Sequence, residues 1–321
     1  MKCLCCNKVI KEPNEYEQVS GWHGRCVKRF FGLSRIPLID ISEEQFEKLA
    51  ESNVNKGLTV PGVQKKMSLH LERNAGEGRF TIVGYPTGYI LKPQSNDFRA
   101  LPEAEFLSMK LAEIAGINTV PNGLIRLAGK YAYITKRIDR QGDEMYAMED
   151  FCQLSNRVTA DKYKGSYEGC GKIIDRYSKN VGVDKVEYFY RLLFCFVTGN
   201  SDMHLKNFSL IENSPSSRVF GLSAAYDMLP VNVIMPEDKE QMALTLNGRK
   251  KNIRRKDFLA LAENLGIPIK TSEKLISKIS GYKTIWIEET NASLIPRDMK
   301  EELIKLVENR VDGLFVSQAH R

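Results

Sequence analysis

The sequence predicts an α+β protein with two lobes, a small β-rich lobe followed by an all-helical one. Short apolar stretches separated by turn residues dominate positions 67–136, whereas helical apolar spacing dominates from residue 149 onward. A polar loop, residues 198–211, lies between two apolar runs in the second half. We expect residues 1–30 to form a small N-terminal module, residues 31–140 the first lobe and residues 141–321 the second.

Composition indicates a soluble cytoplasmic protein. The chain has 321 residues, of which 42% are hydrophobic, enough to bury one large core or two lobes. The net charge of +7 is mild and suits an acidic or phosphate-bearing partner, but does not by itself indicate nucleic acid binding. No apolar run reaches the length of a membrane span, and the start of the sequence does not read as a signal peptide. The seven cysteines do not form a secreted disulfide framework in a chain this long.

Cysteine and histidine residues near the start suggest a structural zinc site. Two close pairs separated by a loop, C-x2-C and H-x2-C, can supply four ligands to one tetrahedral zinc ion; the pairs are Cys3 with Cys6 and His23 with Cys26. The alternatives are an N-terminus with free thiols, or Cys5 as a substitute ligand.

The expected elements of the first lobe follow from periodicity. An amphipathic helix is expected within residues 43–52, a strand from residue 67, and a hairpin of strands 80–83 and 89–92. A helix over residues 102–115 and strands 119–127 and 130–136 complete the lobe. Lys92 ends a strand between a glycine-containing loop and a helix, where a kinase places the lysine that binds phosphates. A solvated edge lysine is the alternative.

Helices dominate the predicted second lobe. We expect them at residues 151–154, 170–177, 186–198, 257–265, 272–285 and 296–316, with a short strand at 242–246. Residues 249–256 are markedly basic, which favours a solvated face, or alternatively a binding surface for a protein or nucleic-acid partner.

The polar loop carries the chemistry. The loop contains the motif D-x-H-x-K-N, formed by Asp202, His204, Lys206 and Asn207. An isolated carboxylate, Asp227, follows at the end of the next apolar run. Magnesium-assisted phosphoryl transfer needs one carboxylate to accept a hydroxyl proton, and an amide and a second carboxylate to hold the metal on the phosphates. We assign these tasks to Asp202, Asn207 and Asp227. Capping of a turn is the alternative function for such residues.

A series of motifs resembles the HipA-like kinase family, the toxin kinases of bacterial toxin–antitoxin systems. They are VPGVQKKMSL (residues 60–69), YILKP (89–93), LPEAEF (101–106), TKRIDR (135–140), EDFCQ (149–153), KYKGSYE (162–168), GNSDMHLKNFSL (199–210) and AYDMLP (225–230). The resemblance covers the chain from about residue 57 to the C-terminal helices and implies a bilobal protein-kinase-like fold. The chain is short for HipA, and its start resembles the HipT-type kinases.

The resemblance also implies roles for individual residues. It places the nucleotide-covering loop at Gly62, Val63, Gln64 and Lys66, and the adenine contacts on the backbone near Lys136 and Ile138. Glu105 would pair with Lys92, His204 would support Asp202, and Lys206 would neutralise the γ-phosphate. Of the two positions at which HipT-type kinases autophosphorylate, one is Pro61, so Thr59 alone offers a hydroxyl.

The expected function is therefore that of an ATP- and Mg2+-dependent serine/threonine protein kinase acting as a toxin. The resemblance implies an aminoacyl-tRNA synthetase as substrate, a HipB-like antitoxin and a HipS-like small protein as partners, and DNA only indirectly through the antitoxin. The alternatives are a catalytically silent regulator or binding module, and a small-molecule kinase of the same fold. Nothing in the motif residues selects a particular substrate.

Overall fold

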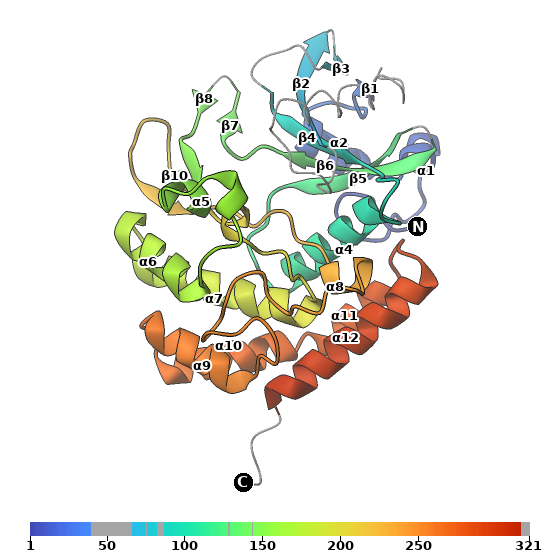
Figure 1. Ribbon diagram of the computed structural model, residues 1–321. Coiled ribbons are helices and arrows are strands. Elements are labelled where there is room, and N and C mark those ends of the chain that lie inside the picture. The colour runs from blue at the N-terminus through green and yellow to red at the C-terminus, as the bar shows by residue number, and fades with distance from the viewer. Residues whose placement is uncertain (40–65, 75, 82–86, 128, 143, 316–321) are drawn as a thin grey trace. The chain divides into compact units, whose positions relative to one another are not determined.

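A computed structural model describes residues 1–39, 66–74, 76–81, 87–127, 129–142 and 144–315 (Figure 1). The chain divides into two units, one of Met1–Phe106 with Val120–Asp143 and one of Leu107–Thr119 with Glu144–Arg321. This division differs from the predicted boundaries in two ways. The first thirty residues belong to the same unit as the sheet, and helix α4 (Leu101–Ile114) contributes to both units.

A six-stranded sheet forms the first unit, in the order β1-β3-β2-β4-β6-β5 (Figure 1). All neighbouring strands are antiparallel except β1 and β3, which are parallel. The strands are β1 (Leu38–Ile39), β2 (Met67–Asn74), β3 (Glu77–Thr81), β4 (Tyr89–Pro93), β5 (Asn122–Leu127) and β6 (Lys130–Lys136). A two-residue strand, β7 (Arg140–Gln141), follows the sheet.

The predicted hairpin between residues 80–83 and 89–92 is wrong. Strand β2 lies between β3 and β4, so that Leu71 pairs with Phe80 on one side and Leu69 pairs with Tyr89 on the other. Apolar periodicity identifies strands but does not fix which strand pairs with which. The strand expected from residue 119 begins three residues later, at Asn122.

Two helices that the sequence analysis did not predict lie near the N-terminus, α1 (Glu15–Ser20) and α2 (Gly24–Phe31). Asn14 caps α1 in a capping box with Glu17, and Gly21 ends it at a φ of 72° that favours glycine. Helix α2 packs its apolar side on the sheet, with the Phe31 ring centroid 6.0 Å from that of Phe80. This aromatic packing places the start of the chain in the core of the first unit.

The second unit is rich in helices around α7 (Val181–Thr198), which is buried at every residue from Tyr188 to its end. Such complete burial is typical of a central helix. The surrounding helices are α5 (Phe151–Leu154), α6 (Tyr167–Tyr177), α8 (Val231–Ile234), α9 (Arg255–Asn264), α10 (Ile269–Ser280), α11 (Lys283–Asn291) and α12 (Arg297–Phe315). Two 3-10 helices, η1 (Thr159–Asp161) and η2 (Leu205–Asn207), occur in the connections.

The second unit also contains short strands. Strand β10 (Ser209–Glu212) pairs antiparallel with β9 (Met148–Asp150) and with β11 (Phe220–Leu222), and β8 (Glu144–Met145) precedes them. The strand predicted at 242–246 is wrong, because these residues form only isolated bridges. The helix predicted at 272–285 is interrupted, since α10 ends at Ser280 and α11 begins at Lys283. The helix predicted at 43–52 lies outside the described residues.

In the part of the chain that the structure describes, no helix combines the length and the apolar character that a membrane crossing requires.

Candidate active site

The end of helix α7 positions the polar loop. The Thr198 hydroxyl donates to the carbonyl oxygen of Phe194 (2.8 Å), and Gly199 ends the helix with a φ of 77°. The loop then continues into η2 and strand β10, whose Leu210 pairs with Leu222 of β11. The buried C-terminal part of α7 on one side and a three-stranded sheet on the other therefore hold Asp202 on a short, supported loop.

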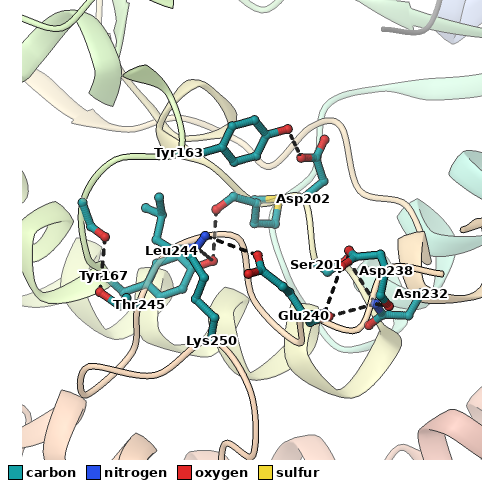
Figure 2. A network of polar contacts seen from close by, with 12 residues as sticks. Tyr163, Tyr167, Ser201, Asp202, Asn232, Asp238, Glu240, Leu244, Thr245 and Lys250 are labelled. Carbon is teal, nitrogen blue, oxygen red and sulfur yellow. Dashed lines mark hydrogen bonds and ion pairs between the residues drawn. The ribbon is translucent and has the colours of Figure 1, made fainter. Parts of the chain in front are cut away.

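Tyr163 contacts the predicted base directly. Its hydroxyl donates to Oδ1 of Asp202 at 2.6 Å, as Figure 2 shows. Burial raises the pKa of Asp202, and the negative charges of Asp227 and Asp238 raise it further, while the Tyr163 hydrogen bond and Lys162 oppose the change. A carboxylate with a raised pKa is a better proton acceptor than an ordinary aspartate, which suits a general base.

The side chains of Asn207 and Asp227 are suited to hold a divalent cation. The buried Asn207 amide nitrogen donates to the backbone carbonyl of Asp202 (2.9 Å), which leaves the amide oxygen as the ligand atom. Asp227 occupies the left-handed region at a φ of 57°, an unusual conformation for a non-glycine residue. Its charge acts on Asp202, so the two carboxylates are close enough to repel each other. A hard, oxygen-liganded ion such as Mg2+ would relieve that repulsion.

His204 does not support Asp202 as predicted. Among the described residues its side chain has no hydrogen bond to that carboxylate, and its buried Nδ1 has no partner. Its ring instead meets the ring of Tyr163 edge-on, with the centroids 5.0 Å apart. Burial lowers the pKa of His204 to about 4, so the imidazole is neutral at physiological pH. The residue that orients Asp202 is therefore Tyr163, with His204 packed against its ring.

Lys206 has a protein partner in the structure. Its Nζ lies 2.8 Å from Oδ2 of Asp150, the residue that also caps helix α5. Its backbone carbonyl accepts a hydrogen bond from the Tyr226 hydroxyl at 3.0 Å. The ion pair links the loop to the start of α5. To contact a phosphate, the Lys206 ammonium group would have to bind the phosphate and Asp150 together, or break its ion pair with Asp150.

In the first unit, Lys92 and Glu105 form a buried ion pair. Nζ of Lys92 is 2.7 Å from Oε1 of Glu105, and the two side chains are 7% and 0% exposed. Lys92 ends strand β4 and Glu105 lies in the second turn of α4, so a strand and a helix each contribute one charge. The Tyr133 ring lies 5.5 Å from the same ammonium group. Burial on this scale argues against a solvated edge lysine.

Three further residues predicted for nucleotide binding lie within the described part of the first unit. Lys66 is exposed, just before β2. Nζ of Lys136 lies 5.5 Å from the Phe30 ring centroid, and its pKa is lowered mainly by burial. The backbone N–H groups of Lys136 and Arg137 donate to Pro121 and Gly88, and Ile138 is half-buried beyond them. Thr59, Gly62, Val63 and Gln64 lie outside the described residues.

A partly buried polar network next to Asp202 was not predicted. The Ser201 hydroxyl donates to Asp238 (2.6 Å) and accepts from the Asn232 amide (3.2 Å), as seen in Figure 2. Arg310 of α12 donates to the Asn232 amide oxygen and to the carbonyl of Phe196. The network thus connects the last helix to the residue before Asp202. Its members are far apart in the sequence, and of them only Ser201 lies in one of the motifs, GNSDMHLKNFSL.

The basic run forms ion pairs within the second unit. Lys250 contacts Glu240 at 3.2 Å, Arg255 contacts Glu273 at 3.3 Å, and Arg249 lies 3.9 Å from Asp257. These pairs favour a role in holding the surface of the unit together. Arg254 and Lys256 line a shallow surface depression together with Arg249 and Asn252.

Comparison with known proteins identifies relatives. The sequence model described as HipA-like C-terminal domain matches residues 58–286. A protein of Sinorhizobium fredii named "Putative kinase Y4dM" is 32% identical over 253 residues, which are 72% of this chain and 59% of that protein. The serine/threonine-protein kinase toxin HipA of Shewanella oneidensis is 26% identical over 270 residues, which are 76% of this chain and 60% of that protein. This chain thus spans about three fifths of the length of these two relatives.

A solved structure shares the fold. The structure of HipA from Shewanella oneidensis MR-1, in complex with HipB and its operator DNA, matches with a TM-score of 0.65 at 20% identity. The match covers 80% of this chain and 65% of that one. At this identity the likeness concerns the fold, which confirms the predicted α+β, protein-kinase-like class.

Proposed function

Because the chain belongs to the family of HipA-like C-terminal domains, we propose that it is an ATP-dependent protein kinase that modifies a serine or threonine hydroxyl. The observation that carries the proposal is the loop on which Asp202, hydrogen-bonded by Tyr163, lies beside Asn207 and close to Asp227. A proton acceptor next to two oxygen ligands for a metal is the arrangement that phosphoryl transfer requires.

Asp202 acts as the general base in this proposal. The substrate hydroxyl oxygen forms a bond to the γ-phosphorus of ATP, the bond from that phosphorus to the bridging oxygen breaks, and ADP leaves. The hydroxyl proton passes to the Asp202 carboxylate, whose pKa is raised by burial. The Tyr163 hydroxyl holds one carboxylate oxygen, Oδ1, and leaves Oδ2 for the substrate.

Asn207 and Asp227 would hold Mg2+ through the amide oxygen and a carboxylate oxygen. When bound, the ion supplies positive charge to the β- and γ-phosphate oxygens. Lys92 would contact the α- and β-phosphates, and Glu105 fixes the direction of its ammonium group. Lys66, Gly62, Val63 and Gln64 would cover the nucleotide, and the backbone near Lys136 and Ile138 would contact the adenine.

A role as the toxin of a bacterial toxin–antitoxin system is the finer form of this proposal. It rests on the relative named a kinase toxin and on the solved complex of HipA with HipB and operator DNA. A HipB-like antitoxin and a HipS-like small protein are the proposed partners, and an aminoacyl-tRNA synthetase is the proposed substrate. Thr59 is the proposed site of autophosphorylation.

The test combines nucleotide binding with intact mass. Purified protein is incubated with ATP and Mg2+, and wild type is compared with Asp202→Gln, Lys92→Met and a control, Asp161→Asn, whose carboxylate pairs with Lys164 in a partly exposed contact. We expect phosphate on wild type and control, ATP binding without phosphate on Asp202→Gln, and weakened ATP binding by Lys92→Met. Absence of ATP binding by the wild type would contradict a kinase and favour a silent regulator. Phosphate mapped to Thr59 would support the autophosphorylation site.

A further inference from the structure

Four side chains that bind metals well meet at the N-terminus of the first unit. The ligand atoms of Cys3, Cys6, His23 and Cys26 all lie within 4.8 Å of one another. Four donors around a tetrahedral zinc ion would be separated by about 3.5–3.8 Å, given Zn–S and Zn–N bonds of about 2.3 and 2.1 Å. The Cys6 Sγ to His23 Nδ1 distance is 3.4 Å and the Cys26 Sγ to His23 Nδ1 distance is 3.9 Å, close to that requirement.

The backbone presents these ligands in two local structures. Cys3 and Cys6 lie on a tight turn, in which the Cys3 N–H donates to the Lys8 carbonyl (2.8 Å) and the Asn7 N–H donates to the Cys3 carbonyl (2.9 Å). His23 precedes helix α2 as its N-cap residue, and Cys26 lies in the first turn. A turn and a helix start therefore each supply a pair, the usual way in which short segments form a structural zinc site.

The histidine is oriented for coordination. Its Nε2 lies 3.3 Å from the carbonyl oxygen of Val9, and because that oxygen can only accept, Nε2 must carry the proton. Nδ1 is then the atom with the free lone pair, and it is the atom that faces Cys6 and Cys26. A carbonyl that fixes the other ring nitrogen is the usual outer partner of a metal-binding histidine. The His23 N–H also points to Cys3 Sγ, at 3.4 Å.

We propose that Cys3, Cys6, His23 and Cys26 bind one structural Zn2+ ion that fastens the N-terminal segments to the edge of the sheet. All four tetrahedral positions are filled by protein, so none remains for a substrate or a reactive water molecule. The proposal does not depend on kinase activity, because its ligands belong to none of the elements assigned to phosphoryl transfer.

The residues next to the ligands hold the edge strand β5. Trp22 precedes His23, and its indole N–H donates to the Leu124 carbonyl (2.7 Å), while the Leu124 N–H donates to the carbonyl of Leu4, which follows Cys3 (2.7 Å). Gly123 makes this approach possible, because a Cβ atom there would lie 2.6 Å from the Trp22 ring. The two segments that hold this edge strand also contact each other directly, because the Leu4 N–H donates to the Gly21 carbonyl (2.8 Å). The proposed ion would add a second link between them, so it should stabilise the sheet.

The zinc content of the purified protein tests the proposal directly. Protein purified without added metal, and with its thiols reduced, is assayed for zinc by mass spectrometry for wild type, Cys26→Ser, His23→Gln and Cys5→Ser. Cys5 is a matched control because it is a buried thiol in the same turn but is not one of the four ligands. We expect one zinc per chain in wild type and Cys5→Ser, and background levels in the other two variants.

Cobalt titration of the metal-free wild type covers the case in which a variant does not fold. One equivalent should produce the intense visible bands of tetrahedral, thiolate-bound Co2+, and zinc should displace it. A metal-free wild type that binds no cobalt would overturn the proposal, as would iron in place of zinc or loss of zinc from Cys5→Ser to the same extent as from Cys26→Ser. Because these readouts are independent of ATP, a negative result here leaves the kinase proposal standing, and the reverse is also true.

Discussion

The hydroxyl of Tyr163 donates a 2.6 Å hydrogen bond to Oδ1 of Asp202. This contact stabilises the ionised carboxylate and opposes the effects of burial and of the neighbouring aspartates on its pKa. In Tyr163→Phe the pKa of Asp202 should therefore rise further, because the stabilising donor is lost while burial remains. The acidic limb of the pH profile of kcat should move to higher pH. An unchanged limb would show that Asp202 is not the group whose ionisation controls turnover.

The Lys92–Glu105 pair should be costly to break. Glu105→Gln removes the carboxylate that pairs with the buried Lys92 ammonium group, and we expect a loss of about 3–5 kcal/mol in the free energy of unfolding. The control is Glu301→Gln, whose carboxylate pairs with Arg297 where the two side chains are 64% and 91% exposed, and which should cost about 0–1 kcal/mol. Chemical denaturation measures both values. Equal losses would mean that the burial of the first pair has no energetic consequence.

Arg310 should contribute to stability through its geometry more than through its charge. The guanidinium donates to Phe196 and Asn232, and burial lowers its pKa to about 10. Arg310→Lys cannot reach both acceptors with one ammonium group, and we expect a loss of about 2–4 kcal/mol in the free energy of unfolding.

The matched control for Arg310 is Arg297→Lys on the same helix. Arg297 is 91% exposed and pairs with Glu301 four residues later, so the substitution should leave the thermal midpoint nearly unchanged. Turnover by Arg310→Lys should also fall, because Asn232 holds Ser201 next to Asp202. If Arg310→Lys is fully folded and its turnover is normal, the network has a structural role only.

His204 should make folding sensitive to acid. Its pKa is about 4 in the folded protein and 6.5 when unperturbed, so between these values the unfolded chain binds more protons. The contribution of neutral His204 to the free energy of unfolding is therefore complete above pH 6.5 and is lost as the pH falls toward about 4. His204→Gln should weaken that pH dependence. The difference between the unfolding free energies of the two proteins, measured from pH 7 to pH 4.5, should shrink as the pH falls, and parallel curves would contradict this reasoning.

Local patterns predicted the elements that depend on local physics. Strand β6 over Lys130–Lys136 and helix α4 follow from apolar periodicity, and the close approach of Cys3, Cys6, His23 and Cys26 was expected from their spacing. The pairing of Lys92 with Glu105 was also expected, but from the resemblance to the HipA-like kinase family and not from a local pattern.

Contacts between distant residues were not accessible from the sequence. Tyr163 is 39 residues from Asp202, and Asp150 is 56 residues from Lys206. No periodicity within a helix or strand links such positions, so His204 was given the role that Tyr163 holds, and Lys206 was assigned to a phosphate without its carboxylate partner. The position of β2 between β3 and β4 was missed for the same reason, because strand order depends on the packing of the whole sheet.

Transfer of the γ-phosphoryl group is the direct test of Asp202 as the catalytic base. Wild type and Asp202→Asn are each incubated with labelled ATP, Mg2+ and a heat-treated bacterial extract as a source of protein substrates, after both have been shown to bind ATP equally. We expect labelled phosphoserine or phosphothreonine with wild type and a loss of at least about 100-fold with Asp202→Asn, since removal of a general base costs about that much or more. Equal labelling by the two proteins, or none by a wild type that binds ATP, would contradict the assignment of Asp202 as the catalytic base of a protein kinase.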